Sequence, residues 1–526
     1  MLNNEIYLSC DHMEKGIKAY HSYLNLCNTE EVLPETVRED LNMNDLCEQV
    51  DYTSSCIGRQ YLYHILCTDK VSDVAQHEQF IEKLQTDHPL RNQLVNALQK
   101  LNKPDAYSIV DILAEKEHTY SRGYLLMIQI CRWLPAFFLI LMFQFSSSPI
   151  PFILLLVSYI FNGYLHFKQK NILSCYYFSI PQLYKLLKTV DYLSTIPSFL
   201  SINDKVESTT RHLKALCRKL GSFRFGIALE SESAMIVYLL TELINIFTLY
   251  STINIVTSFQ SIQKRKGEIE QAFRYVGFLD MLCSISFLRE KLPYYCKPSN
   301  EKEGERLKAD GIYHPLIKNC VSNDVSLSDK SMLITGSNMS GKTSFIRTVA
   351  INLLTAKALN TCFAKEFCID INRRLYSVIH TEDDLVEGKS YFFKEAENVK
   401  AALEKGKEGN YLLIFDELFK GTNTMERIAI NSAVFSDLAK ADNLIFASTH
   451  DLELTTLLND QYELYHFSEK VTDDKLLFDY KLKKGVAKEG NAIKILELCG
   501  YPSLIVQTAK DALCVIPSKS LIDIRL

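Results

Sequence analysis

Residues 331–343 read Ser-Met-Leu-Ile-Thr-Gly-Ser-Asn-Met-Ser-Gly-Lys-Thr, a short apolar run that leads into a glycine-rich loop. From Gly336 to Thr343 the loop matches the pattern G-x-x-x-x-G-K-[ST] in full. We expect a strand over Ser331–Thr335 and a helix over Ser344–Ala356, which is the setting that the pattern requires. The sequence therefore predicts a nucleotide-binding loop within an α/β region.

The residue types in this loop suit a phosphate chain. Glycines let successive backbone N–H groups turn toward phosphate oxygens, and the N-terminus of the following helix favours negative charge. Lys342 would neutralise the β- and γ-phosphates of ATP, and the Thr343 hydroxyl would bind Mg²⁺. The candidate cofactor-binding residues are Gly336, Ser337, Asn338, Met339, Ser340, Gly341, Lys342 and Thr343.

Two later apolar runs end in polar side chains that such a loop could use. Asp416 and Glu417 follow Tyr411–Phe415, and His450 follows the run Asn443–Ser448. Asp416 would hold Mg²⁺ through water, and Glu417 would orient or deprotonate the attacking water. His450 would sense the γ-phosphate. Taken alone, an acidic pair or a histidine at a strand end is an ordinary polar terminus.

The region Gly311–Leu513 carries short motifs in the order and at the spacing of one protein family. They are Tyr313-His314-Pro315-Leu316, Thr335-Gly336-Ser337-Asn338-Met339, Asp416-Glu417, Gly421-Thr422-Asn423-Thr424 and Thr449-His450. The region resembles the ATPase domain of the MutS family of mismatch-repair proteins. Residues Val32–Leu101 are similar to the start of that family's helical core, notably at Asp51-Tyr52-Thr53-Ser54 and Gly58-Arg59.

The resemblance implies ATP and Mg²⁺ as cofactors and a homodimer that forms through the ATPase domains. Asn338 would be a polar contact of the phosphate loop. Ser390 would open a helix aimed at the γ-phosphate bound by the partner subunit, because a helix N-terminus with a hydroxyl favours the extra charge of ATP over ADP. Without the resemblance, Ser390 would be interpreted as an ordinary helix cap.

The sequence also departs from the family pattern. We expect the mismatch-reading, connector and clamp domains and a downstream nuclease-like module to be missing. Phe80-Ile81-Glu82 has the letters of the family's mismatch wedge, but we expect it to pack in a core helix. No aromatic residue that would stack on adenine precedes the first ATPase strand, where Cys320-Val321 stands.

An apolar hairpin stands where the clamp would interrupt the helical core. From Gly123 to Phe167 there is no acidic residue, and Arg132 is the one Lys or Arg. Spans over Trp133–Ile150 and Ile150–Phe167 would each reach about 27 Å, enough to cross a hydrocarbon core. Arg122, Arg132, Lys168 and Lys170 would all lie on one side of it. We expect membrane contact through residues 133–167; the alternative is a buried hairpin in a soluble core.

A third apolar stretch, Ala234–Phe259, contains Glu242, Asn245 and Asn254. Because polar groups are costly in lipid, we expect a buried core helix there and not a third span.

Composition limits the remaining possibilities. With 58 Lys+Arg against 63 Asp+Glu, the net charge of −5 excludes nucleic-acid binding through bulk charge. Few glycines (19) and prolines (13) favour long helices, and 15 cysteines without a C-x-x-C pair suggest reduced thiols. The first 30 residues lack a signal-peptide pattern.

The predicted fold is mixed: a helical core with a transmembrane hairpin, followed by an α/β P-loop NTPase domain of the ABC type. The predicted parts are a first core segment (1–120), the hairpin (121–170), a second core segment (171–300) and the ATPase domain (301–526).

The leading functional hypothesis is an ATPase anchored in the cytoplasmic (inner) membrane, with the N-terminal helices and ATPase domain on the cytoplasmic side. Its nucleotide cycle would open and close a dimer. The alternatives are a mismatch-repair factor that holds duplex DNA between core domains, and a membrane scaffold with a weak ATPase.

Overall fold

The computed structural model describes residues 2–27, 31–114, 121–145, 147–174, 179–203, 205–221, 232–300, 304–337, 340–379, 391–471, 476–486, 493, 496–497 and 500–515. The contacts divide the chain into two compact units, which are described separately. Unit 1 comprises 1–29, 52–64 and 79–287; unit 2 comprises 30–51, 65–78 and 288–526. The predicted four-part division remains a prediction.

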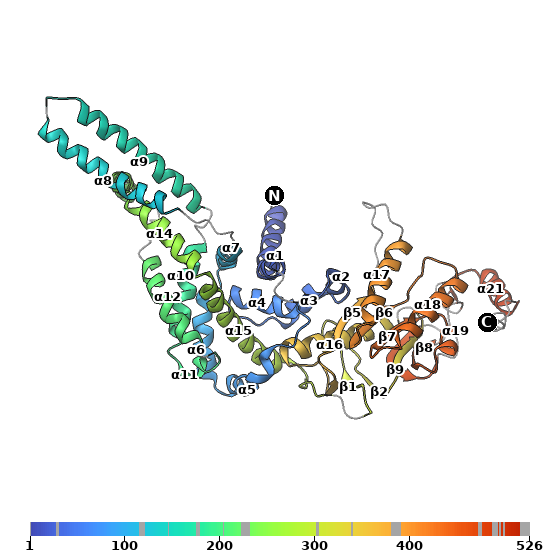
Figure 1. Cartoon of the computed structure of the whole chain (residues 1–526). Helices are drawn as coiled ribbons and strands as arrows, with labels where there is room; N and C mark the ends of the chain where they lie inside the picture. Colours follow the sequence, from blue (N-terminus) through green and yellow to red (C-terminus); the bar gives the residue numbers. More distant parts are fainter. Residues whose placement is uncertain are drawn as a thin grey trace. The chain divides into compact units, whose positions relative to one another are not determined.

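Unit 1 is helical (Figure 1). The helices that lie mainly in it are α1 (Leu2–Leu26), α4 (Cys56–Leu66), α5 (Glu78–Thr86), α6 (His88–Leu98), α7 (Ile109–Ala114), α8 (Arg122–Gln144), α9 (Ile150–Ser174), α10 (Ser179–Leu193), α11 (Pro197–Leu200), α12 (Lys205–Gly221), α13 (Glu232–Thr248), α14 (Tyr250–Lys264) and α15 (Lys266–Lys291), with 3₁₀ turns η2 (Gln99–Leu101) and η3 (Pro104–Ser108). Phe80 and Ile81 are buried in α5, as expected of core packing.

The motif around Ser54 and Gly58 has a structural reason. Asp280 on α15 is fully buried, and its carboxylate accepts the backbone N–H groups of Ser54 and Ser55, each at 2.8 Å. A Cβ on Gly58 would lie 2.1 Å from Asp280 Oδ2, so only glycine fits. The start of α4 is therefore attached to α15 through the carboxyl group of Asp280.

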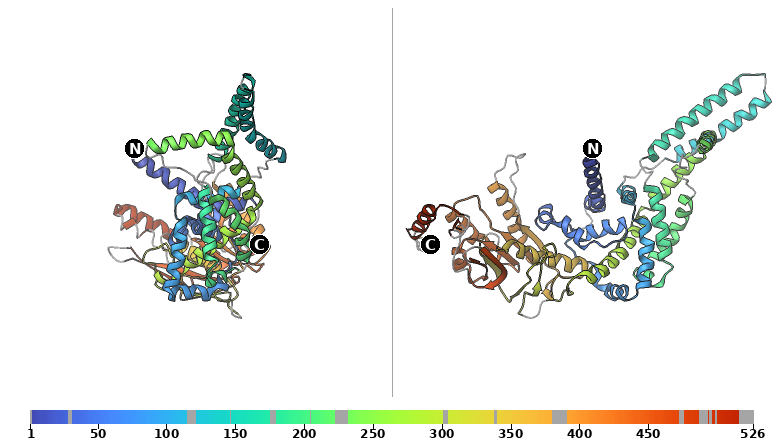
Figure 2. Two further views of the ribbon diagram at one scale, coloured as in Figure 1. Left: turned by 90° about the vertical axis from the view of Figure 1, so that its left-hand side faces the viewer. Right: turned by 180° about the vertical axis from the view of Figure 1, so that it is seen from behind.

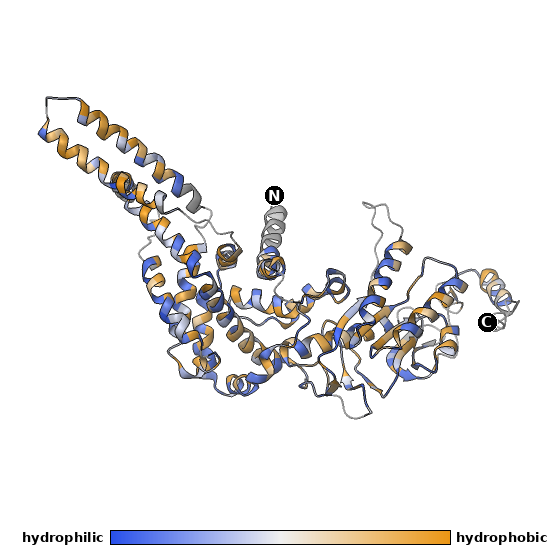
Figure 3. Cartoon of the chain, in the orientation of Figure 1, coloured by the Kyte–Doolittle hydropathy of each residue, from blue (hydrophilic) through white to orange (hydrophobic). Residues whose placement is uncertain are grey.

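Helices α8 and α9 form an antiparallel apolar hairpin (Figures 1 and 3). The apolar spans are Gly123–Gln144, with 22 residues, and Ile150–Gln169, with 20. The predicted first span, Trp133–Ile150, was wrong at both ends, because α8 begins at Arg122 and stops at Gln144. The helix begins there because Ser121 caps it: the Ser121 hydroxyl accepts the Tyr124 N–H at 3.2 Å. Of the most apolar 18-residue stretch in each span, only 17% is buried in α8 and 28% in α9.

The third apolar stretch is not one helix. It forms α13 and α14, which are separated by Leu249 in the left-handed conformation (φ 47°). Helix α13 is seen end-on beside α8 in Figure 1 and lengthwise in the left view of Figure 2, so it crosses the hairpin. Both α13 and α14 pack against α8 and α9. Between Leu240 and Thr248, where the burial of α13 is described, Leu240, Leu243 and Ile244 are exposed and Ile246 is buried, so the expectation of a buried helix is wrong for that outer face. It holds for one face of α14, which buries Val256 and Phe259.

Unit 2 contains two sheets. Among the described residues, β5-β6-β7-β3-β8-β9 form one sheet, parallel except for the β8–β9 pair, and β2-β1-β4 form a smaller antiparallel sheet. The strands are β1 (Leu307–Ile312), β2 (Asn323–Leu327), β3 (Ser331–Thr335), β4 (Glu366–Ile369), β5 (Arg374–Val378), β6 (Tyr411–Asp416), β7 (Leu444–Thr449), β8 (Tyr462–Val471) and β9 (Leu476–Lys484).

The helices of unit 2 are α2 (Glu35–Asp40), α3 (Met43–Val50), α16 (Lys342–Leu359), α17 (Tyr391–Gly406), α18 (Thr424–Leu438), α19 (Glu453–Leu457) and α21 (Ser503–Val515), with the 3₁₀ turn η1 (Asp73–His77). Helix α16 packs on β6 and β7, and α17 packs on β5 and β6. The strands β3, β6 and β7 are almost wholly buried, which explains their continuous apolar runs.

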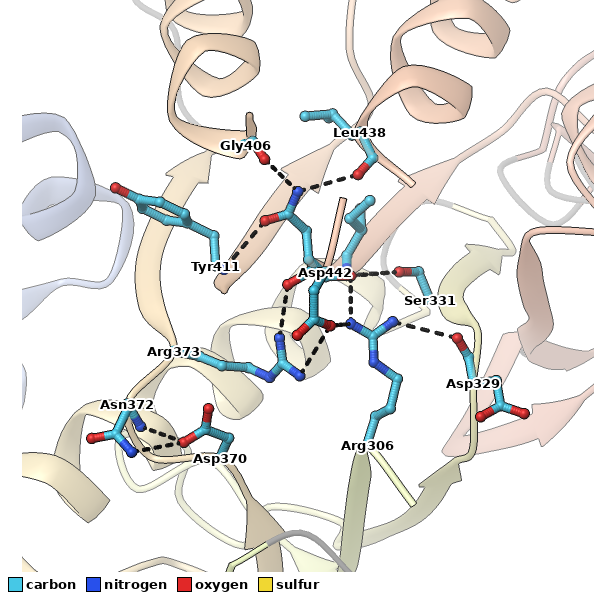
Figure 4. A network of polar contacts seen from close by, with 12 residues as sticks. Arg306, Asp329, Ser331, Asp370, Asn372, Arg373, Gly406, Tyr411, Leu438 and Asp442 are labelled. Atoms are coloured by element: carbon cyan, nitrogen blue, oxygen red, sulfur yellow. Dashed lines mark hydrogen bonds and ion pairs between the residues drawn. The ribbon is translucent and has the colours of Figure 1, made fainter. Parts of the chain in front are cut away.

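A polar network holds the turn before β7 (Figure 4). Asn443 is buried; its amide donates to the carbonyls of Gly406 (2.8 Å) and Leu438 (3.2 Å), and its oxygen accepts the Tyr411 N–H (3.2 Å). Arg306 adds a 2.6 Å contact to the exposed carboxylate of Asp442. The Asn443 side chain thus forms hydrogen bonds with backbone groups of α17, α18 and β6.

Candidate active site

The carboxyl ends of three neighbouring strands form the site. In the parallel register, Thr335 of β3 pairs with Thr449 of β7, and Asp416 of β6 pairs with Ser448 of β7. The loops that follow β3, β6 and β7 therefore leave the sheet side by side. Ligands of open α/β sheets bind at this edge.

The phosphate loop joins β3 to α16. Gly336 (φ 141°) has no room for a side chain, because a Cβ would lie 2.7 Å from the Phe467 carbonyl oxygen. The buried ammonium of Lys342 donates to the carbonyls of Gly336 (2.9 Å) and Ser337 (3.0 Å), and the Ser340 hydroxyl donates to Ser337 O (2.7 Å). Burial lowers the pKa of Lys342, while the nearby carboxylate of Glu417 opposes that shift. The loop thus has a compact frame closed by its own lysine.

Three of the predicted residues fall outside the described residues. They are Asn338, Met339 and Ser390. Gly341, with φ 106°, is the N-cap of α16. The predicted roles of Asn338, Met339 and Ser390 remain predictions.

The predicted magnesium ligands meet at the start of α16. The Thr343 hydroxyl donates to Asp416 Oδ2 at 2.7 Å, and the Ser448 hydroxyl donates to Asp416 Oδ1. A hydroxyl beside a carboxylate is the hard oxygen donor set that Mg²⁺ prefers. The residues present therefore fit the ion, and Ser448 fixes the orientation of Asp416, which sequence reasoning missed.

Glu417 lies where two lysine side chains and one histidine converge. Its Oε1 is 3.2 Å from Lys342 Nζ and 2.7 Å from His450 Nε2, and its Oε2 is 2.9 Å from Lys420 Nζ. Burial would raise the pKa of Glu417, but the hydrogen bonds from His450 and Lys420 and the charge of Lys342 lower it to about 2. Glu417 is therefore an ionised carboxylate at neutral pH.

The backbone that carries Glu417 is strained. Glu417 (φ 50°) and Phe419 (φ 60°) both adopt the left-handed conformation, which non-glycine residues rarely do. The Glu417 N–H donates to Ser448 O at 3.1 Å, and the Phe419 N–H donates to the buried carboxylate of Glu395 on α17 at 2.7 Å. Sequence reasoning missed Glu395, because a glutamate in an amphipathic helix normally faces solvent.

A cavity of about 450 Å³ opens beside the loop. Its lining includes the following residues: His314, Ile317, Cys320, Val321, Lys342, Thr343, Phe467 and Tyr480. A Cβ on Gly341 would lie 3.3 Å from the Tyr480 ring, so this aromatic side chain lies over the loop. The Asn323 side chain holds the backbone that follows the ring, by donating to Tyr480 O (3.1 Å) and accepting the Leu482 N–H (2.8 Å).

The fold and this site define a P-loop ATPase domain. More specifically, residues 332–516 match the family MutS domain V, so this part of the chain is a MutS-type, ATP-hydrolysing domain. The loop, Asp416, Glu417 and His450, which were predicted from separate motifs, lie together in it.

Curated relatives agree with the family match. The chain is 33% identical over 267 residues to the DNA mismatch repair protein MutS of Clostridium novyi, a match that covers 48% of this chain and 29% of that protein. It is 28% identical over 254 residues to that of Thermus thermophilus (48% and 31%) and 29% identical over 276 residues to that of Pseudothermotoga lettingae (51% and 34%). The chain spans about a third of the length of these relatives.

Proposed function

We propose that this chain is a membrane-anchored ATPase whose nucleotide cycle opens and closes a homodimer of its ATPase domains. The observation that carries the proposal is the convergence of Lys342, Thr343, Asp416, Glu417 and His450 at one sheet edge in a chain that also exposes a long apolar hairpin.

In this proposal Lys342 and the loop N–H groups bind the phosphate chain, whose oxygens replace the loop carbonyls as acceptors for the ammonium. Thr343 and Asp416 would hold Mg²⁺, which neutralises charge on the phosphate oxygens when bound. With a pKa near 2, Glu417 is a poor proton acceptor, so its carboxylate serves first to orient the attacking water. His450 links the γ-phosphate region to Glu417.

The ring of Tyr480 supplies the base contact that the sequence did not reveal. It lies at the cavity wall next to Gly341 and is 44% exposed, which leaves a face for stacking. Aromatic stacking is the common way to bind a base without reading its edge. We infer that adenine occupies this cavity.

Dimer closure draws support from α17. Its first turn exposes the large apolar side chains of Phe392 and Phe393, directly after the predicted position of Ser390. A contact from Ser390 to the γ-phosphate of the partner subunit would favour the closed dimer with ATP over ADP, and such differential affinity is what a population shift requires.

Membrane anchoring draws support from the exposed surface of α8 and α9. Large apolar side chains such as Trp133, Ile140, Phe143 and Ile160 are more than half exposed. A helix in a soluble core would bury these side chains. Many large apolar side chains exposed on the same two helices indicate an interaction site. We place the anchor in the cytoplasmic membrane, with the ATPase domain on the cytoplasmic side.

The full chain purified in detergent should hydrolyse ATP and dimerise with ATP and magnesium, measured by phosphate release and light scattering. Glu417→Gln should bind ATP normally but hydrolyse it at least 100-fold more slowly. The matched control is Glu408→Gln, an exposed carboxylate paired with Arg374. Normal turnover in Glu417→Gln would refute the role of Glu417, and a monomer with ATP would refute dimer closure.

A second candidate is a DNA-binding repair factor, because the relatives at 28–33% identity are named DNA mismatch repair proteins. Its test is a gel shift with duplex DNA over a salt series, in which a steep loss of binding with salt supports it. No binding at low salt removes it. A scaffold with a weak ATPase is disfavoured by the intact set Lys342, Thr343, Asp416 and Glu417.

A further inference from the structure

A row of polar side chains lies buried along α9. Ser158, Asn162, His166 and Gln169 recur every three or four residues and so share one face of the helix. The opposite face exposes Ile153, Ile160 and other apolar side chains. An apolar hairpin would not need such a row to pack, so the contacts of these polar groups require a specific reason.

Part of the row contacts α8. The Asn162 amide donates to Cys131 O at 3.2 Å, and the Gln169 amide donates to the Tyr124 hydroxyl at 2.6 Å. These bonds fix the two helices of the hairpin against each other. Polar groups that face inward and pair are the arrangement expected in an apolar environment.

His166 contacts both α13 and α14. Its Nε2 lies 2.8 Å from Glu242 Oε2 on α13, and its Nδ1 lies 3.2 Å from the Thr252 hydroxyl on α14. Close to this pair, a Cβ on Gly163 would lie in ordinary van der Waals contact, 3.8 Å from Ile246 Cγ2 of α13, so α13 also lies against α9 at this position. Helix α13 is thus attached to α9 at the level of residues 163–166.

That level coincides with the boundary expected for a bilayer. Residues 163–166 lie about 20–24 Å from the start of α9 at 1.5 Å per residue, close to the near side of a hydrocarbon core of about 30 Å. Side chains that favour the interface gather there: Lys168 lies over the Tyr164 ring at 5.9 Å, and Arg132 over the Trp133 ring at 5.4 Å.

Away from the hairpin, α13 presents an apolar face. Leu240, Leu243 and Ile244, at positions i, i+3 and i+4, are 55%, 53% and 62% exposed. Tyr250, the first residue of α14, is 57% exposed and has the amphipathic ring typical of the membrane interface. Helices α8 and α9 also expose large apolar side chains. Helix α13 crosses the hairpin instead of running along it (Figures 1 and 2).

We propose that α13 is an in-plane membrane helix that lies at the headgroup–acyl boundary of a phospholipid bilayer and is fastened to the hairpin through His166 and Glu242. This inference rests on the proposed membrane anchoring. A bilayer is the occupant because α13 is attached to α9 at the interfacial level and exposes large apolar side chains, as the two hairpin helices do. As a 17-residue helix that carries Glu242 and Asn245 across the hairpin, α13 is not a third span.

The single tryptophan of the chain makes a direct test possible. The full chain is placed in phospholipid vesicles whose lipids carry bromine either near the headgroup or near the chain end, and tryptophan quenching is measured. The wild type reports Trp133 on α8. Leu243→Trp and, separately, Ile244→Trp in a Trp133→Phe background report α13. Leu457→Trp in the same background, exposed on α19, is the control.

Trp133 should be quenched, the two α13 positions should be quenched at least twofold more by shallow than by deep bromine, and Leu457→Trp should not be quenched. Adding His166→Ala should lower the quenching at Leu243→Trp. If Trp133 is quenched but both α13 reporters are not, α13 does not contact lipid and the inference fails while the anchor stands. Deep quenching of α13 would also overturn it. Without quenching of Trp133, the proposed anchor itself fails.

Discussion

The carboxylate of Glu395 accepts the backbone N–H of Phe419 at 2.7 Å, so the first turns of α17 hold the strained loop that carries Glu417. Glu395 is buried, and among the described residues its second oxygen has no hydrogen-bond partner. Burial raises the pKa of Glu395, while the Phe419 N–H and Lys420 lower it in part. The bond connects the helix predicted to face the partner subunit with the residue predicted to orient water.

Glu395→Ala should lower kcat for ATP about 10- to 100-fold with little change in KM, because loss of the bond lets Glu417 move from its position. Glu395→Gln should restore most of the rate, because the amide oxygen still accepts the Phe419 N–H. Steady-state kinetics on the full chain give both values. The control is Asn352→Ala, which removes a similar buried bond to the Phe363 N–H (2.6 Å) away from the site and should change stability only. Unchanged kcat in Glu395→Ala would contradict the positioning role.

Tyr480→Ala should raise the KM for ATP about 5- to 100-fold with kcat unchanged, since stacking on a base contributes roughly 1–3 kcal/mol. Tyr480→Phe keeps the ring and should behave as the wild type. An equal KM in Tyr480→Ala and the wild type would show that the base binds elsewhere.

His314 should make the stability of the ATPase domain depend on pH. Burial, aided by the charge of Arg347, lowers the pKa of His314 to about 4, and its Nδ1 accepts the Leu316 N–H at 3.3 Å. Between that pH and the usual histidine pKa of about 6.5, the unfolded chain binds a proton that the folded chain does not. Stability therefore falls as pH falls through this window, by about 2 kcal/mol at pH 5.

His314→Gln should remove this part of the pH dependence. The free energy of unfolding of the ATPase domain is measured at pH 7.5 and at pH 5 by urea titration of the full chain, with proteolysis of that domain as the readout. If both proteins lose equal stability over that interval, His314 does not contribute as the lowered pKa requires.

Asn443→Ala should destabilise the ATPase domain by about 2–4 kcal/mol, because it removes the bonds of Asn443 to the Leu438 carbonyl and the Tyr411 N–H, whereas the Gly406 carbonyl keeps the Gly409 N–H at 3.1 Å. Asp442→Ala, in the same network but 72% exposed at its side chain, should cost less than about 1 kcal/mol. Thermal unfolding with ATPase activity as a second readout compares them. Equal effects of the two substitutions would contradict the difference argued from burial.

The ATPase core was predictable because its elements carry local signals. The strand expected over Ser331–Thr335 is β3 with the same bounds, and the runs ending near Asp416 and Thr449 are β6 and β7 within one residue. Parallel strands align their carboxyl ends, so motifs that lie far apart in the chain meet. Little more than glycine spacing and buried runs was needed.

Tyr480 and Glu395 could not be predicted in this way, because neither lies in a motif. Tyr480 adopts the left-handed conformation (φ 51°), and Asn323 of β2 bonds to the β9 backbone at this point. Asn323 and Tyr480 lie about 160 residues apart in the chain, so no local signal predicts their contact. The break at Leu249 also had no sequence signal, since neither glycine nor proline stands there. By contrast, Ser121 was a readable cap that would have corrected the start of α8.

The pairing of His166 with Glu242 has a consequence for synthesis of the chain. His166 leaves the ribosome about 75 residues ahead of Glu242, which at 5–20 residues per second is a delay of roughly 4–15 seconds. During that interval the His166 imidazole lies on the apolar helix α9 while Glu242 is still untranslated. A chain truncated before codon 232 would therefore contain both hairpin helices but neither α13 nor the carboxylate that His166 contacts in the full chain.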